Sequence, residues 1–113
     1  METPTQLELY QVRKPADELR QRRTAALVEL LRYAEDWLTA KEIAKRMLLD
    51  DRQIRDLAEH ASPKVISGDK GYRHTDRATA EEITHFVNRM ESQCKRMADR
   101  ALAVRRYAHS RIG

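Results

Sequence analysis

Residues 39–60 read TAKEIAKRMLLDDRQIRDLAEH, and this stretch contains two helix starts eleven residues apart. Thr39 with Glu42, and Asp50 with Gln53, are capping pairs: the first side chain accepts a hydrogen bond from an early backbone N–H of the helix. We therefore predict a short helix that begins after Thr39 and a second helix over residues 51–60.

Apolar residues in this stretch recur where two crossing helices need buried side chains. The predicted core positions are Ile43, Ala44, Met47, Leu49, Ile54 and Leu57. Ala44 is small where the two helices cross, and Leu49 is expected to fill the turn between them. The stretch is therefore predicted to form a compact helix pair.

The sequence before this pair predicts another helix. Pro15, Asp17 and Glu18 are typical of a first helical turn, and apolar residues then follow at helical spacing. These apolar residues are Leu19, Ala26, Leu27, Leu30, Leu31 and Ala34. We predict an amphipathic helix over residues 16–33, and a flexible arm over residues 1–14, which show no helical period.

The sequence after the pair predicts a β-hairpin. Val65 and Ile66 form a short apolar run, residues 67–71 (SGDKG) are rich in turn formers, and residues 72–74 (YRH) can form a returning strand. Trp37 and Tyr72 are expected to pack where the helices meet this hairpin.

The order of three helices and two strands, with the apolar spacing of residues 39–60, resembles the winged helix-turn-helix family. The resemblance covers residues 39–75 and implies a mainly α fold, with a winged helix-turn-helix domain over residues 15–78. That family commonly has Gly at the position of Leu48, where the turn is left-handed. Leu48 is therefore expected to be strained, or the turn to differ.

The resemblance implies binding of double-stranded DNA, with the third helix in the major groove and the hairpin on the backbone. Arg52, Gln53 and Arg55 are the expected base contacts, because arginine can pair with guanine and glutamine with adenine. Phosphate contacts are expected from Lys41 and Lys45 on the second helix and from Lys70 and Arg73 on the hairpin.

The charges of the predicted recognition helix oppose this interpretation. Asp50, Asp51, Asp56 and Glu59 outnumber its two arginines, and carboxylates repel phosphates. Asp50 is needed as a helix cap, and Asp56 is predicted to pair with Arg52 at i, i+4 spacing. DNA affinity is therefore expected to depend on the hairpin and the C-terminal helix. The alternative is a protein–protein adaptor that uses the winged helix and the last helix as docking surfaces.

Residues 79–113 are predicted to form a basic amphipathic helix of up to about 33 residues, because Thr79 and Glu82 form a capping pair and no Gly or Pro follows until Gly113. Its apolar stripe consists of Ile83, Phe86, Val87, Met90, Cys94, Met97, Ala101, Val104 and Ala108. We expect a homodimer through this helix, because its distal half cannot be covered by one small core. The alternative is that the distal half folds back as a hairpin.

Most of the excess positive charge lies on this last helix. From Arg89 onward there are seven basic and two acidic residues, whereas residues 1–88 carry 15 basic and 16 acidic residues. Arg96 and Arg100 are expected to contact DNA phosphates. The alternative is that these charges only solvate a partly exposed helix.

Composition excludes several other classes of protein. Charged residues make up 35% and aromatic residues 5% of the chain, and Cys94 is the single cysteine. No apolar run suits a signal peptide or a membrane span, and no motif indicates a metal site, a cofactor or catalysis. We expect a cytoplasmic, non-enzymatic protein that acts as a transcriptional regulator or as a replication or recombination accessory factor.

Overall fold

The computed structural model describes residues 15–112, which form a mainly helical structure with one small antiparallel sheet. The predicted N-terminal arm, residues 1–14, lies outside the described residues. The helices are α2 (Pro15–Arg32), α3 (Ala40–Met47), α4 (Asp51–His60) and α5 (Ala80–Ile112), the strands are β1 (Val65–Gly68) and β2 (Gly71–His74), and a 3-10 helix, η1, covers Thr75–Arg77. The chain divides into two compact units between Arg77 and Ala78, so that α5 forms a unit of its own.

Three helices begin where their capping pairs predict. The pairs are Thr39–Glu42, Asp50–Gln53 and Thr79–Glu82, in which the backbone N–H of the second residue donates to the first side chain at 3.2, 2.8 and 3.1 Å. In the last two pairs the second side chain also accepts a hydrogen bond from the N–H of the first residue. These bonds satisfy N–H groups that a helix leaves unpaired, which explains the sharp starts of α3, α4 and α5.

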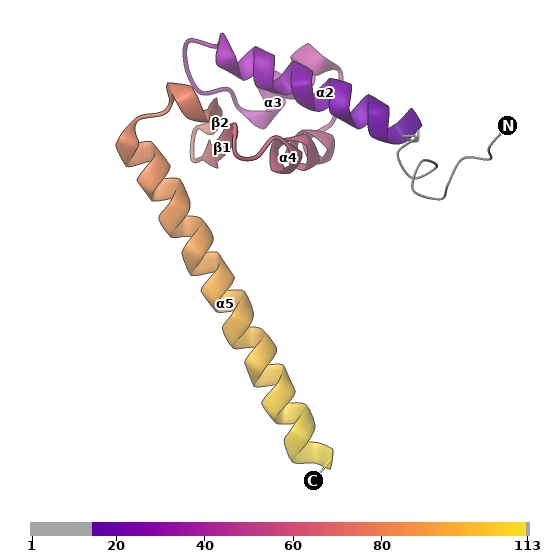
Figure 1. Ribbon diagram of the computed structural model, residues 1–113, viewed down its shortest axis with the longest axis vertical. Helices are drawn as coiled ribbons and strands as arrows, with labels where there is room; N and C mark the ends of the chain where they lie inside the picture. The colour runs from indigo at the N-terminus through magenta and orange to yellow at the C-terminus, as the bar shows by residue number, and fades with distance from the viewer. Residues whose placement is uncertain (1–14, 113) are drawn as a thin grey trace, which may run out of the picture. The chain divides into compact units, whose positions relative to one another are not determined.

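The core of the first unit lies between α2, α3, α4 and the hairpin. Leu27, Leu31, Ile43 and Ile54 are fully buried, and Leu57 is 3% exposed. Helix α2 packs against α4 and β2, while α3 packs against α4 (Figure 1). The two helices of the central stretch therefore share one core with the first helix, as their apolar spacing predicts.

The buried face of α2 differs from the predicted stripe. Leu19 and Ala26 are exposed, whereas Val28, absent from that stripe, is buried. Because α2 contacts both α4 and β2, its buried face is turned toward Val28. The prediction was wrong at these positions because helical spacing alone does not say which neighbours cover a helix.

The hairpin is tighter than predicted. Gly68 pairs with Gly71, so the turn contains only Asp69 and Lys70. Tyr72 also exchanges two backbone hydrogen bonds with Leu38, at 2.8 and 3.1 Å, which adds the segment between α2 and α3 to the free edge of β2. The Trp37 ring lies against Gly68, so Trp37 and Tyr72 pack at the junction of helices and hairpin as predicted.

Leu48 adopts the left-handed conformation that its position requires, with φ 57° and ψ 44°. Its backbone N–H donates to the carbonyl of Ala44 and so caps α3, while its side chain is 89% exposed. A leucine in this region crowds its own Cβ against the backbone. Of the two predicted alternatives, the structure shows a left-handed turn with leucine in place of glycine.

Leu48→Gly is expected to raise the free energy of unfolding by about 0.5–1 kcal/mol, because the steric cost of a left-handed leucine exceeds the extra chain entropy of glycine. The exposed side chain contributes little packing that the change would remove. The measurement is urea denaturation followed by helical circular dichroism. Leu48→Ala is the control, since it retains Cβ and should change stability by less than the glycine variant.

Candidate nucleic-acid interface

Helix α4 buries one face and exposes the opposite one. Ile54 and Leu57 lie in the core, whereas Arg52, Arg55 and Glu59 are exposed on the other side. Among residues 15–112, no ion pair or hydrogen bond of a side chain involves Arg52 or Arg55. Both guanidinium groups are therefore available to a ligand at this face.

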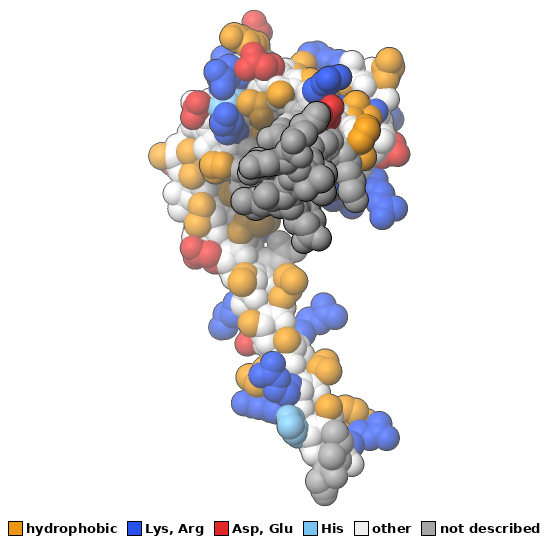
Figure 2. Space-filling model, turned by 45° about the vertical axis from the view of Figure 1, so that its right-hand side comes forward, with side chains coloured by type: hydrophobic (Ala, Val, Ile, Leu, Met, Phe, Trp, Pro, Cys, Tyr) orange, Lys and Arg blue, Asp and Glu red, His pale blue; other side chains and the backbone are white. Residues whose placement is uncertain are grey.

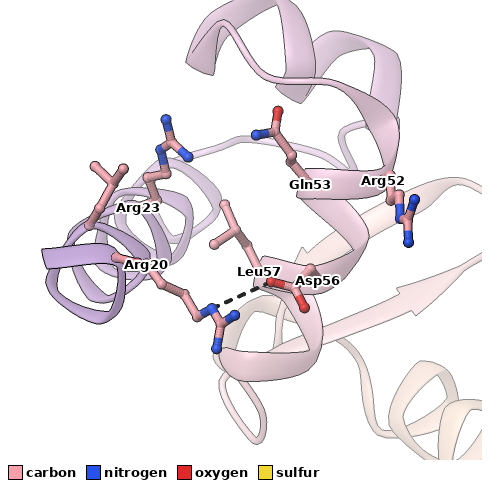
Figure 3. A pocket seen from close by; sticks show the side chains of 8 residues that line it. Arg20, Arg23, Arg52, Gln53, Asp56 and Leu57 are labelled. Atoms are coloured by element: carbon pink, nitrogen blue, oxygen red, sulfur yellow. Dashed lines mark ion pairs between the residues drawn. The ribbon is translucent and has the colours of Figure 1, made fainter. Parts of the chain in front are cut away.

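A groove of about 460 Å³ runs between the N-terminal half of α2 and the first turns of α4. It is lined by Ala16, Leu19, Arg20, Arg23, Arg52, Gln53, Asp56 and Leu57. Leu57 points from α4 toward α2, and Arg52 lies at the rim with its guanidinium directed away from α2 (Figure 3). The groove thus has an apolar floor and a rim with three arginines and one carboxylate.

Asp56 pairs with α2 and not with Arg52, which corrects the predicted i, i+4 pair. Its carboxylate lies 3.7 Å from Nε of Arg20, and Arg52 points away from it (Figure 3). His60 joins the same cluster: its Nδ1 lies 2.9 Å from the Asp56 carbonyl oxygen, and its Nε2 lies 3.2 Å from a guanidinium nitrogen of Arg20. The contact between α2 and α4 brings Arg20 closer to this carboxylate than helical spacing brings Arg52.

Gln53 performs a structural task at the start of α4. Its side-chain oxygen accepts a hydrogen bond from the backbone N–H of Asp50 at 3.0 Å, as the returning half of the capping pair. A bidentate contact to adenine needs both the oxygen and the NH₂ group of a glutamine. The predicted base contact from Gln53 would therefore compete with the cap of α4.

Arg73 also has a structural partner. One guanidinium nitrogen donates to the carbonyl of Ala34 at 3.3 Å, and Arg77 from η1 donates to the carbonyl of Arg32 at the same distance. Both arginines thus complement the negative C-terminal end of α2. Arg73 is only partly exposed, whereas Lys70, at the tip of the hairpin, is fully on the surface.

The other predicted phosphate contacts are exposed but belong to different parts of the chain. Lys41 and Lys45 lie on the side of α3 away from the buried Ile43. Arg96 and Arg100 lie on α5, in the second unit. The structure brings Arg52 and Gln53 together with α2 residues, and it leaves Lys41 and Lys45 on α3 and Lys70 at the tip of the hairpin.

Arg20 and Arg23 were not predicted as site residues, although they line the groove beside Arg52. The signal that could have identified them is the basic run of residues 20–23 (RQRR), the densest cluster of arginine before residue 89. The run alone does not say which element it faces, and it is the packing of α2 against α4 that places it beside Arg52. Because Arg20 and Arg23 add positive charge from α2, the surface around the start of α4 is more basic than the residues of α4 alone would make it.

His74 contributes to the core of the hairpin, since only 1% of it is exposed. Its Nδ1 accepts a hydrogen bond from the backbone N–H of Asp76 at 3.0 Å. Among residues 15–112, no group of three or more His, Cys, Asp or Glu side chains is arranged to hold a metal ion. The histidines therefore give no reason to place a metal in this part of the chain.

Protein-family models, curated proteins and solved structures provide no match. Within the described residues 15–112, every helix is too short or too polar to cross a lipid bilayer.

Proposed function

We propose that residues 15–77 form a winged helix-turn-helix and bind double-stranded DNA through α4. The observation that carries this proposal is the exposed face of α4, on which Arg52 and Arg55 have no partner among the described residues. A helix of this diameter fits the major groove, and a free guanidinium there can bind O6 and N7 of guanine. Residues 39–60 would then act as the helix-turn-helix.

The arrangement of the strands supports the winged-helix part of the proposal. Between the first two helices, Leu38 exchanges hydrogen bonds with Tyr72, so that a short extended segment lies beside the hairpin. The hairpin follows directly after the third helix and ends in a two-residue tip. This is the order of elements that the resemblance implies for a winged helix.

The contacts of the acidic residues remove part of the electrostatic objection to DNA. Asp50 is engaged in capping α4, and Asp56 is paired with Arg20 at 3.7 Å. The exposed carboxylates that remain on α4 are those of Asp51 and Glu59, which equal Arg52 and Arg55 in number. The repulsion that α4 exerts on phosphates is therefore weaker than its sequence suggests.

The residues would divide into two roles. Arg52 would read a base edge and Arg55 a base or a phosphate, while Lys41, Lys45 and Lys70 would contact phosphates without reading sequence. A module of this kind suits a transcriptional regulator or a replication or recombination accessory factor. Arg73 donates to a carbonyl at the end of α2, so its main role would be to fix the hairpin against α2 and not to bind DNA.

Sequence selection from a random duplex pool, followed by fluorescence anisotropy with selected and scrambled duplexes, tests the proposal. We expect Arg52→Ala with Arg55→Ala to reduce the preference for the selected duplex about 10–100-fold, because each good bidentate base contact contributes about 1–3 kcal/mol of discrimination. Lys41→Ala with Lys45→Ala should weaken binding to both duplexes equally. A folded sample that binds neither duplex at low salt would contradict the proposal.

A second candidate function is docking of a protein partner at the same unit. The observation that favours it is Leu48, a leucine that is 89% exposed at the turn between α3 and α4. Leu48→Ser distinguishes the two functions, since it leaves every basic residue in place. If the protein binds DNA, the Leu48→Ser variant should bind it with unchanged affinity. If the protein binds no duplex and the Leu48→Ser variant loses a protein partner, docking is favoured.

A further inference from the structure

Eight apolar residues of α5 recur in alternating steps of four and three. They are Ile83, Val87, Met90, Cys94, Met97, Ala101, Val104 and Ala108. The average step of 3.5 residues is the heptad period of a left-handed coiled coil, and it is maintained over 26 residues of the 33-residue helix. We name these eight positions the seam.

The seam is exposed along the distal half of α5. Met97 is 64% exposed and Val104 is 68% exposed, and hydrophobic and basic side chains follow one another along the helix (Figure 2). The seam extends over about 38 Å, at 1.5 Å per residue. A face of this length and period is complementary to another long helix with the same period.

Residue sizes along the seam indicate how such a helix would be oriented. One half of the heptad positions holds small residues, namely Val87, Cys94, Ala101 and Ala108, and the other half holds Ile83, Met90, Met97 and Val104. In a parallel pair each residue faces its own copy, so Ala101 and Ala108 each form a layer of two alanines and Met90 and Met97 each form a layer of two methionines. In an antiparallel pair each small position faces a position of the other set, which gives even packing.

We propose that α5 pairs with α5 of a second copy of this chain as an antiparallel coiled coil over its full length. With the two helices fully overlapped, Met90 faces Ala101 of the second copy, Met97 faces Cys94, and Ile83 faces Ala108. Val87 faces Val104 in the remaining layers. Each layer then contains one larger and one smaller residue or two valines, so none is left with a void between two alanines.

The charges beside the seam favour the same orientation. In a parallel pair Arg100 would lie next to Arg105 of the second copy on both sides of the dimer, and like charges there repel. In the antiparallel pair, Arg105 and Glu91 of the second copy are offset by about 7.5 Å along the helix axis. Flanking charge pairs in parallel coiled coils span the same axial offset. Arg100 then lies beside Gln93, and Phe86 beside Tyr107.

This inference is independent of the DNA-binding proposal, because it concerns only α5 and is tested without DNA. The test uses chains with a single cysteine, made in a Cys94→Ala background. One chain carries Met90→Cys and the other carries Ala101→Cys. A short bismaleimide then joins cysteines that face each other across the dimer.

We expect covalent dimers when the two chains are mixed and none with either chain alone. Facing positions are close in the antiparallel pair, whereas identical positions are displaced by eleven residues, or about 16 Å along the axis. Coupling within each chain alone would show a parallel pair and overturn the proposal. Absence of coupling in the mixture would also overturn it, provided that the second pair, Ile83→Cys with Ala108→Cys, fails as well.

Two controls make these results specific. Ser92→Cys, on the outer side of α5, should not couple to the Ala101→Cys chain, which excludes coupling by random collision. Sedimentation of the Cys94→Ala chain at micromolar concentration should show a dimer, and a monomer throughout the concentration series would overturn the proposal without any cross-linking.

Discussion

Gly71→Ala is expected to lower the free energy of unfolding by about 3–4 kcal/mol, a large part of the stability of a small domain. Gly71 has φ +119°, a region that side chains rarely adopt, and a Cβ there would overlap the carbonyl of Leu38, at 2.6 Å from its carbon and 2.8 Å from Cα of Thr39. Both obstacles are backbone atoms, so the segment at Leu38 must move. The backbone strain and the loss of the two Leu38–Tyr72 hydrogen bonds add up to the expected cost.

Urea denaturation followed by the fluorescence of the single tryptophan, Trp37, measures this effect. Gly68→Ala is the matched control in the same hairpin, because a Cβ there would meet only the Trp37 ring, at 3.1 Å, and a side chain can move aside. We expect the control to lose less than half as much stability. Equal losses in the two variants would mean that the close approach of β2 to Leu38 does not hold the hairpin in place.

The starts of the helices could be predicted because the signals that determine them are local. A capping pair involves residues three positions apart, so the pair at Asp50 and Gln53 specifies the start of α4 without reference to the rest of the chain. Thr79 and Glu82 specify the start of α5 in the same way, and the absence of Gly and Pro before Gly113 allows its 33-residue length. The two-residue hairpin turn was less predictable, because its tightness depends on the contact between Gly71 and Leu38, 33 residues apart.

The partners of the charged residues could not be predicted from spacing. Asp56 has an arginine four positions before it, yet it pairs with Arg20, 36 residues away, because α2 packs against α4. Arg73, which is predicted to contact the DNA backbone, donates a hydrogen bond to the carbonyl of Ala34. Both cases depend on which helix lies nearby, which is a property of the packed core and not of the local sequence.

The candidate site was therefore only partly predictable. The exposed face of α4 follows from the apolar spacing of Ile54 and Leu57, which identifies Arg52 and Arg55 as outward-facing residues. The contribution of Arg20 and Arg23 follows from the contact between α2 and α4. The assignment of Lys41, Lys45 and Lys70 to phosphates stays a prediction.

Raising the salt concentration from 50 to 200 mM is expected to weaken DNA binding about 40-fold. Each neutralised phosphate contributes a slope of about −0.9 to the dependence of log affinity on log salt, so three phosphate contacts give a slope of about −2.7. The three proposed contacts are Lys41, Lys45 and Lys70, and all are exposed. Arg73 is omitted, because its guanidinium is engaged at the end of α2.

Single substitutions then test the individual contacts, with affinity measured by fluorescence anisotropy across the salt series. Lys70→Ala should reduce the slope by about 0.9, since it removes one phosphate contact at the tip of the hairpin. Lys64→Ala is the matched control, because Lys64 is also an exposed lysine and lies just before β1, outside the proposed contacts. Its slope should equal that of the unchanged protein. A Lys70→Ala slope equal to that of the control would remove the hairpin tip from the interface, and a slope near zero in the unchanged protein would contradict backbone binding altogether.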